Sequence, residues 1–359
     1  MKVLMVITGL GMGGAEHVVT NLADELVTLG HTVKIAYLTG DVIVSPKSHD
    51  IELISIGMNS PKDFVKAYFK LRSVVNEFKP DVIHSHMFHS NIISRLLRLT
   101  ISVPKIVSSS HNTHEGGRLR MLAYRSTYKL ADISTNVSQE AVDTLVEKGA
   151  VKSGRMISVV NGIDINQFYF DKDARKNKRI ELDIVNQKVV LAVGRLNHQK
   201  DYQNLLNSIF LLKKQRYDFK FLIAGDGPLK EELMLLLNKL EIAEFVEFLG
   251  IRRDIPALMS ASDLFVLSSA WEGFGLVVAE AMACECVVVA TDCGGVREVV
   301  GSEGFLVEPN NNILLAQALN KALDLSDDER SSIGAAARTR IINHYSLSAN
   351  VDAYLKLYA

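Results

Sequence analysis

Short apolar runs alternate along the chain with longer stretches in which apolar residues recur every three or four positions. The first run, KVLMVI, is followed by a stretch with helical spacing at 15–29, and the next runs are HTVKIAYL and DVIH. Short apolar runs are typical of buried strands, and the wider spacing is typical of amphipathic helices. The alternation predicts β-α-β units, in which helices cover parallel sheets.

The alternation is interrupted once, near the middle of the chain. A predicted strand at 156–160 runs into Asn161-Gly162-Ile163-Asp164 and the polar stretch DKDARKNKRIELD, and apolar runs resume with KVVLAVG. Glycine and clustered polar residues are typical of linkers, and 359 residues are enough for two domains. We therefore expect an α/β protein of two similar halves, with ligands beyond the carboxyl ends of the strands.

Charge and apolar content exclude several classes of protein. The 40 basic and 41 acidic residues leave a net charge of −1, so we expect no nucleic-acid partner. The apolar runs are far shorter than the roughly 18 residues of a membrane span. Cys284, Cys286 and Cys293 have no nearby histidine and an unfavourable spacing for a disulfide, which predicts buried free thiols in a reducing cytoplasm.

A glycine-rich loop follows the first predicted strand. The segment from Gly9 to Gly14, GLGMGG, matches the dinucleotide pattern G-x-G-x-x-G, and Glu16 stands in the first turn of the next helix. A nicotinamide site also needs an acidic residue at the end of the second strand, where Ala36-Tyr37-Leu38-Thr39 stands instead. An oxidoreductase is therefore disfavoured. Two interpretations of the loop remain equal: its backbone approaches a ligand closely, or it is only a tight turn between strand and helix.

Two turns of the second half carry further candidate chemistry. Strand KVVLAVG ends in Gly194-Arg195, with Lys200 five residues later, and FKFLIA ends in Gly225-Asp226-Gly227-Pro228. An arginine with a lysine suits a diphosphate whose charge grows as a bond to it breaks, although a solvated basic loop is the simpler interpretation of this pair alone. Asp226 is a candidate N-cap of a helix from Pro228.

The segment SSAWEGFGLVVAEA, which begins at Ser268, is the most specific in the chain. It predicts the end of a strand, a loop whose glycines leave the backbone accessible, and a helix that starts near Gly275. The amides at the start of this helix could then bind an anion without the help of a metal. Glu272 stands in the loop and Glu280 on the apolar helix, where a buried carboxylate needs a hydroxyl or a cation. Sugar hydroxyls are suitable partners, and a loop charge with a helix salt bridge is the plainer alternative.

With these motifs the sequence resembles the retaining nucleotide-sugar glycosyltransferases of family 4. The resemblance spans the chain and includes Gly13-Gly14-Ala15-Glu16, His111-Asn112, the Asn161 turn, Arg195 with Lys200, Gly225-Asp226-Gly227-Pro228, Phe248-Leu249-Gly250, Glu272 to Glu280 and Thr291-Asp292-Cys293-Gly294-Gly295. It implies the GT-B fold of two facing Rossmann-like domains with an interdomain cleft. Residues 1–164 would form the acceptor-binding domain and 165–344 the nucleotide-sugar-binding domain, with a last helix at about 345–359 packed back on the first.

The resemblance also implies roles for single residues. Arg195, Lys200 and the amides at 274–276 would hold the donor diphosphate, Glu280 the ribose and Glu272 the transferred sugar. The catalytic residues would be His111, Glu272, Arg195 and Lys200. The donor-binding residues would be Gly13, Gly14, Glu16, Arg195, Lys200, Gly225, Gly250, Ile251, Arg252, Glu272, Gly273, Phe274, Gly275, Leu276 and Glu280. His86 and Asn112 would lie on the acceptor side.

Eight of the ten histidines precede Asp164. Five of them end or follow the predicted strands DVIH and KIVSSS, namely His84, His86, His89, His111 and His114. A metal cluster there is disfavoured, because no carboxylate stands between the histidines of either group and their spacing is irregular. We expect no metal and no cofactor.

The stretch from Ser60 to Leu130 is basic, with 12 Lys and Arg residues against 4 acidic ones. Lys62, Lys66 and Lys70 recur at four-residue spacing and so share one helix face. A solvated amphipathic helix is the ordinary interpretation of such a face. Because relatives of this family often use lipid-linked acceptors, docking to an anionic membrane is an equal alternative. In that interpretation a cytoplasmic protein binds the inner face of the membrane.

These observations predict a metal-independent retaining glycosyltransferase. It would move a hexose or N-acetylhexosamine from a nucleoside-diphosphate sugar, with UDP as the expected nucleotide, to a glycan or lipid-linked glycan in cell-surface polysaccharide or glycoconjugate synthesis. The alternatives are a sugar-nucleotide epimerase of the same fold and a non-catalytic partner subunit that binds a sugar nucleotide.

Overall fold

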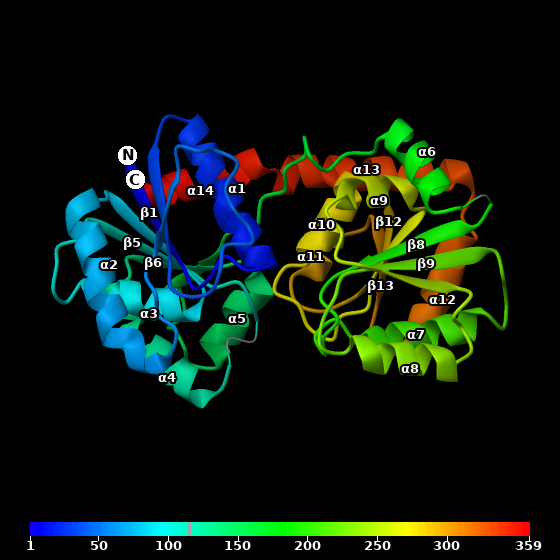
Figure 1. Cartoon of the computed structure of the whole chain (residues 1–359), viewed down its shortest axis with the longest axis horizontal. Coiled ribbons are helices and arrows are strands. Elements are labelled where there is room, and N and C mark those ends of the chain that lie inside the picture. The colour runs from blue at the N-terminus through cyan, green and yellow to red at the C-terminus, as the bar shows by residue number, and fades with distance from the viewer. Residues whose placement is uncertain (114–115, 185) are drawn as a thin grey trace. The chain divides into compact units, whose positions relative to one another are not determined.

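The computed structural model describes residues 1–113, 116–184 and 186–359, which form two compact units (Figure 1). Unit 1 contains Met1–Gly162 and Leu347–Ala359, and unit 2 contains Ile163–Ser346. Each unit has one parallel sheet with helices on its faces. The predicted α/β class with two Rossmann-like parallel-sheet halves is thereby confirmed.

The sheet of unit 1 has seven parallel strands in the order β3-β2-β1-β4-β5-β6-β7. The strands are β1 (Lys2–Ile7), β2 (Thr32–Tyr37), β3 (Glu52–Ser55), β4 (Val82–His86), β5 (Lys105–Ser109), β6 (Ile133–Asn136) and β7 (Met156–Ser158). The helices are α1 (Gly14–Thr28), α2 (Phe64–Phe78), α3 (Phe88–Leu97), α4 (Arg118–Thr127), α5 (Gln139–Glu147) and α14 (Leu347–Tyr358), with short 3-10 turns at η1 (Pro61–Asp63) and η2 (Tyr128–Leu130).

Successive residues of β1 enter different apolar cores. Met5 packs with residues of α1 and with Tyr354 of α14, whereas Leu4 packs with Leu71 of α2 and Ile93 of α3. Neighbouring side chains of a strand point to opposite faces, so α1 with α14 and α2 with α3 cover the two faces of the sheet. The C-terminal helix is therefore part of the core of unit 1.

The sheet of unit 2 has six parallel strands in the order β10-β9-β8-β11-β12-β13. They are β8 (Lys188–Val193), β9 (Phe219–Ala224), β10 (Val246–Gly250), β11 (Leu264–Leu267), β12 (Val287–Thr291) and β13 (Gly304–Val307). The helices are α6 (Lys172–Glu181), α7 (Tyr202–Leu212), α8 (Lys230–Lys239), α9 (Ile255–Ala261), α10 (Leu276–Ala283), α11 (Val296–Val300), α12 (Asn312–Leu323) and α13 (Asp327–Tyr345).

The polar stretch that we placed at the domain boundary forms helix α6 of unit 2. The Asp171 side chain caps it by accepting from the backbone of Asp173 and Ala174, both at 2.9 Å. Arg175 and Arg179 then donate to the carboxylate of Asp263 at 2.6 and 3.2 Å. Because α6 has no fully buried residue, its attachment through ion pairs leaves no apolar periodicity in the sequence.

Two further predictions bear on compartment and membrane. Cys284, Cys286 and Cys293 are free and buried, as expected. Across the described ranges, no helix combines the length and the hydropathy that a bilayer crossing requires.

Candidate active site

The turns after β8 and β9 pack backbone against backbone and present Arg195. A Cβ at Gly225 would lie 2.0 Å from the carbonyl oxygen of Gly194, and the amide of Leu196 donates to Asp226 O at 3.0 Å. Only glycine fits at Gly225, because its φ of 144° and this close approach both exclude a side chain. Arg195 is exposed, and no described residue pairs with its guanidinium.

Lys200 and Glu272 form an ion pair at the ends of β8 and β11. Lys200 Nζ donates to Glu272 Oε1 at 2.6 Å, and the two side chains are only 16% and 9% exposed. The lysine stem crosses Gly194, where a Cβ would stand 2.9 Å from Lys200 Cε. The sequence predicted one partner for each residue, a diphosphate for Lys200 and a sugar for Glu272, and here the two bind each other.

Neighbouring polar groups fix the Glu272 carboxylate. Ser269 Oγ donates to it at 2.7 Å, and Gln199 Nε2 at 3.4 Å. Thr291 Oγ1 in turn donates to the carbonyl of Ser269 at 2.6 Å. These supporting residues were not among the predicted ones. The position of Ser269, just after an apolar strand and three residues before Glu272, was the available signal.

The start of α10 offers backbone donors beside this pair. Gly275 is the N-cap with a left-handed φ of 86°. In the chain as described, the amides of Phe274, Gly275 and Leu276 donate to no protein acceptor. Such amides, at the positive end of a helix dipole, attract anions. These amides are the groups that we predicted to face a phosphate.

Glu280 lies one turn further along α10. No donor among the described residues meets its carboxylate, and part of the side chain reaches the surface. Burial raises the pKa of Glu280 to about 7, against the opposing effect of the Lys200 charge. A hydroxyl or a cation from a ligand would satisfy this carboxylate.

The remaining predicted residues of unit 2 follow β10. Gly250, with φ of 66°, accepts from the amide of Gly225 at 2.7 Å, and Ile251 is 63% exposed. Arg252 already binds two carboxylates, Asp254 at 2.5 Å and Glu181 at 3.2 Å. The expected contact of Arg252 with a nucleotide base would therefore use the aliphatic part of its side chain, or it would require one of these ion pairs to break.

Asp226 is not the N-cap that we predicted. Helix α8 begins at Lys230 after Leu229, and the Asp226 carboxylate accepts from the amide of Gly227 at 2.7 Å and from Lys230 Nζ at 3.2 Å. The tight contact of Gly227 with Leu196 holds the turn so that the helix starts later.

In unit 1, the glycine-rich loop leads into α1 with Gly13 as N-cap and Gly14 as first residue. The Glu16 carboxylate folds over Gly13, where a Cβ would stand 2.6 Å from its Oε2. Burial raises the pKa of Glu16, and its own backbone amide opposes this shift. A carboxylate thus occupies the helix start that the resemblance assigns to donor binding.

The carboxyl ends of β4 and β5 bring His86 and His111 together. The two rings share a hydrogen bond of 3.1 Å between Nδ1 of His86 and Nε2 of His111. His86 has no exposed surface, so in this structure it reaches the predicted acceptor side through His111 and not directly. Asn112 is exposed, and its carbonyl accepts from Asn136 at 3.3 Å.

The described histidines form no cluster with other possible metal ligands. Within the described ranges no three His, Cys, Asp or Glu side chains form a ligand cluster. His114 lies outside the described residues.

The basic face of α2 extends from Lys62 in η1 to Lys70. Lys62, Lys66 and Lys70 are all exposed. Between them stand Val65 and Phe69, which are 64% and 58% exposed. The face therefore combines positive charge with apolar surface.

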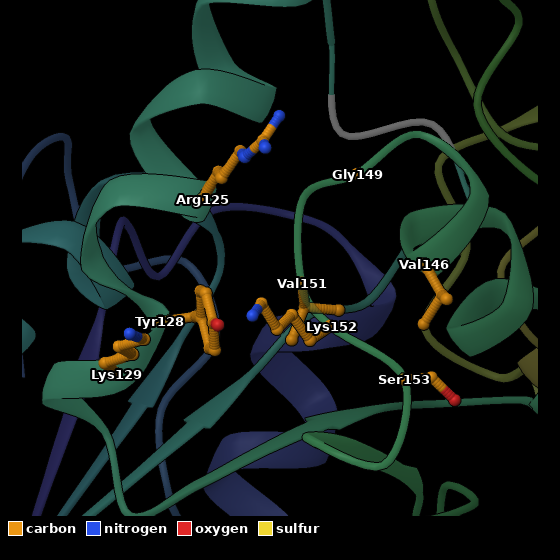
Figure 2. A pocket seen from close by; sticks show the side chains of 8 residues that line it. All are labelled: Arg125, Tyr128, Lys129, Val146, Gly149, Val151, Lys152 and Ser153. Carbon is orange, nitrogen blue, oxygen red and sulfur yellow. The ribbon is translucent and has the colours of Figure 1, made fainter.

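One cavity of unit 1 lies away from all these residues. It has a volume of about 680 Å³ and is lined by Arg125, Tyr128, Lys129, Val146, Gly149, Val151, Lys152 and Ser153 (Figure 2). Its lining includes the segments that precede β6 and β7, so the cavity lies at the amino ends of the strands. It is not the site predicted at their carboxyl ends.

Comparison with known proteins covers both units. Residues 12–167 match the family described as Glycosyltransferase Family 4, and residues 173–340 match Glycosyl transferases group 1. A relative in Campylobacter jejuni, the N-acetylgalactosamine-N,N'-diacetylbacillosaminyl-diphospho-undecaprenol 4-alpha-N-acetylgalactosaminyltransferase, is 27% identical, with 94% of each chain covered. The N-acetyl-alpha-D-glucosaminyl L-malate synthase of Bacillus anthracis is 26% identical over 97% of this chain and 94% of the relative.

Solved structures show the same fold. The Anabaena protein Alr3699/HepE, crystallised in complex with UDP and glucose, superposes with a TM-score of 0.84 at 21% identity and with 99% of this chain and 98% of that chain covered. The two family matches, the two parallel-sheet units and the likeness over nearly the whole chain agree, and the protein belongs to the family 4 glycosyltransferases with the GT-B fold.

Proposed function

We propose that this glycosyltransferase is a retaining, metal-independent enzyme that transfers a hexose or N-acetylhexosamine from a nucleoside-diphosphate sugar, with UDP as the nucleotide, to a lipid-linked glycan. The observation that carries the proposal is the grouping in unit 2 of the Lys200–Glu272 pair with the amides that start α10, which meet no acceptor among the described residues. A donor needs both kinds of group, positive charge for its diphosphate and a carboxylate for its sugar hydroxyls.

In this proposal Arg195, Lys200 and the α10 amides stabilise the leaving diphosphate. Negative charge grows on that group as the bond from the anomeric carbon to the phosphate oxygen breaks, and fixed positive groups favour the charged product. The acceptor oxygen attacks from the side on which the phosphate leaves, and its proton passes to a phosphate oxygen. This order of events keeps the anomeric configuration.

Metal independence rests on the same groups. A nucleotide-sugar enzyme that uses a divalent cation needs carboxylates to hold the cation against the diphosphate. Here a cationic side chain and helix amides supply positive charge, and Glu272 is engaged by Lys200.

Two observations support a lipid-linked acceptor. The Campylobacter jejuni relative is named for a diphospho-undecaprenol substrate. The α2 face combines three lysines with the exposed Val65 and Phe69, a composition suited to the surface of an anionic bilayer. The Bacillus anthracis relative is named for malate, so a small hydroxy acid is the acceptor class to test beside it.

The test has two stages. A thermal-shift screen of nucleoside diphosphates and their sugars should single out one nucleotide, because a ligand at 100 times its Kd stabilises by about 2.7 kcal/mol. The selected donor is then incubated with a polyprenyl-diphosphate-linked sugar or with malate, and NMR gives the anomeric configuration of the product.

A product with the donor's configuration, formed on the lipid-linked acceptor, is expected. An inverted product would exclude the retaining mechanism. Conversion of the donor to its stereoisomer without acceptor would identify an epimerase, and nucleotide binding without any turnover would identify a binding subunit.

A further inference from the structure

Three imidazoles, of which His84 and His86 are buried and His111 is half-buried, form a row at the carboxyl edge of the unit 1 sheet. The ring centroids of His84 and His86 are 3.9 Å apart, and those of His86 and His111 are 5.4 Å apart. Both nitrogens of His84 are used, Nδ1 with the hydroxyl of Tyr358 at 2.6 Å and Nε2 with Ser109 Oγ at 2.7 Å. His84 therefore anchors one end of the row to the core.

His86 has one hydrogen bond for two ring nitrogens. Its Nδ1 pairs with Nε2 of His111 at 3.1 Å, whereas its Nε2 is buried and meets no partner among the described residues. His111 forms this hydrogen bond through its Nε2, and its Nδ1 meets no group in the described chain. Of these two residues only His111 is partly exposed, so only the His111 ring can contact a ligand.

Both rings of this hydrogen bond are neutral at physiological pH. Burial lowers the pKa of His111 to about 4 and lowers the pKa of His86 well below its usual value, with the neighbouring His84 and His111 contributing to the second shift. A neutral imidazole carries one proton, on one nitrogen only. Only two arrangements of the pair are then available.

The two arrangements differ in what is left buried without a partner. If His111 donates from Nε2, the proton of His86 is on its Nε2, and a buried N–H group has no acceptor. If His86 donates from Nδ1, only a bare ring nitrogen is left there. Unpaired buried N–H donors are the rarer defect in folded proteins, and an unmade buried hydrogen bond is costly. The second arrangement is therefore favoured.

We infer that His86 is a positioning residue that donates from Nδ1 to Nε2 of His111 and thereby keeps the proton of His111 on Nδ1. This inference rests on the proposed function. It makes His111 a neutral hydrogen-bond donor to a substrate oxygen. His111 in this form has no free nitrogen to accept the proton of the acceptor hydroxyl.

The backbone next to His86 is held in an uncommon conformation. Met87 has φ of 72°, a region that residues with a side chain rarely adopt, and its amide donates to Ser109 O at 3.0 Å. This contact ties the end of β4 to the end of β5, from which His111 follows. The relative position of the two rings is therefore set by the backbone as well as by their shared bond.

The tautomer is measured directly on the full-length protein. With 15N-labelled histidine, long-range 1H-15N correlation spectra report which ring nitrogen of each histidine is protonated, and the His111→Gln variant assigns the His111 signals. We expect His111 protonated at Nδ1 and unprotonated at Nε2 from pH 6 to 8. A His111 protonated at Nε2 would falsify the inference, whatever the activity of the protein.

The second measurement is the transfer activity of the protein with the identified donor and acceptor. In His86→Asn the amide nitrogen replaces Nδ1, whereas in His86→Gln it replaces Nε2. We expect His86→Asn to keep most of kcat/KM and the tautomer of His111, and both His86→Gln and His86→Leu to lose about tenfold or more, the effect of one hydrogen bond to the reacting complex. Equal losses in Asn, Gln and Leu would contradict a positioning role.

Tyr358→Phe is the matched control. It removes the bond to His84 at the other end of the row, in an equally buried place, and we expect lower thermal stability with the His111 tautomer and kcat unchanged. Because the spectra are recorded without substrate, the tautomer inference and the proposed function fail separately. An Nδ1-protonated His111 in a protein that transfers no sugar would reject only the latter.

Discussion

The Lys200 ammonium donates to the Glu272 carboxylate at 2.6 Å, although 72 residues separate them along the chain. A diphosphate that binds Lys200 therefore competes with Glu272 for the lysine's charge. A sugar that binds Glu272 likewise competes with Lys200. In the proposed function, the pair would therefore couple binding of the diphosphate to binding of the sugar.

Glu272→Ala and Arg195→Ala should separate sugar recognition from nucleotide binding. Arg195 pairs with no residue that the structure describes and is expected on the diphosphate, so Arg195→Ala should weaken binding of both the nucleoside diphosphate and the donor. Glu272→Ala removes the competitor of Lys200, so affinity for the bare nucleoside diphosphate should stay or rise. Its turnover should fall roughly 10²-fold, about 2.7 kcal/mol in the transition state.

Calorimetry with the nucleotide and initial rates with the donor measure the two effects. If Glu272→Ala lost nucleotide binding as severely as Arg195→Ala, or kept full turnover, the sugar would not lie beside Glu272.

Lys200→Met should destabilise unit 2, because it leaves the nearly buried Glu272 charge without its cation. The expected loss is about 3 kcal/mol in the free energy of unfolding, and Lys200→Met with Glu272→Gln should recover most of it. Urea unfolding measures both. The control is Lys230→Met, whose partner Asp226 is 42% exposed, and it should change stability by less than about 0.5 kcal/mol. No recovery in the double variant would contradict the pairing.

Glu280 should make stability depend on pH. Its pKa of about 7 in the fold exceeds the usual 4.5, so between these values the folded protein binds more protons than the unfolded chain. The contribution of Glu280 to the free energy of unfolding is fully present below pH 4.5 and is lost as the pH rises to about 7. The total loss is no more than about 3 kcal/mol. Thermal unfolding of the native protein and Glu280→Gln from pH 4.5 to 8 tests this. Parallel pH profiles would show that Glu280 titrates normally.

Transfer should survive chelation. The groups proposed for the diphosphate are Arg195, Lys200 and backbone amides, none of which needs a metal. Initial rates should therefore be equal with and without EDTA. A rate that falls in EDTA and returns with magnesium or manganese would assign a metal to the reaction and reject this part of the proposal.

Replacing Lys62, Lys66 and Lys70 by Glu should abolish sedimentation with anionic vesicles. Binding of the native protein should also weaken with salt, because the Debye length falls from about 10 Å at 0.1 M to about 3 Å at 1 M. The control replaces Lys148, Lys172 and Lys176, which are also exposed, with Glu. Equal losses in both triple variants would indicate unspecific charge, and no loss in either would leave α2 as a solvated helix.

Much of the site was predictable because local sequence decides local geometry. The apolar runs became parallel strands, the loops after them carry the predicted residues, and Gly275 starts α10 in a left-handed conformation that favours glycine. Helix starts of this kind are built from consecutive residues. Their amides and glycines are therefore visible in the sequence.

The partners of those residues were decided only by the tertiary structure. His84 meets Tyr358 across 274 positions, and Arg175 with Arg179 meets Asp263 across more than 80. The spacing of residues along a chain determines which face of a strand or helix each one occupies, but not which side chain from another element will oppose it. Packing closes those pairs, and packing also turned a charged stretch without apolar periodicity into helix α6 and buried His86 behind His111.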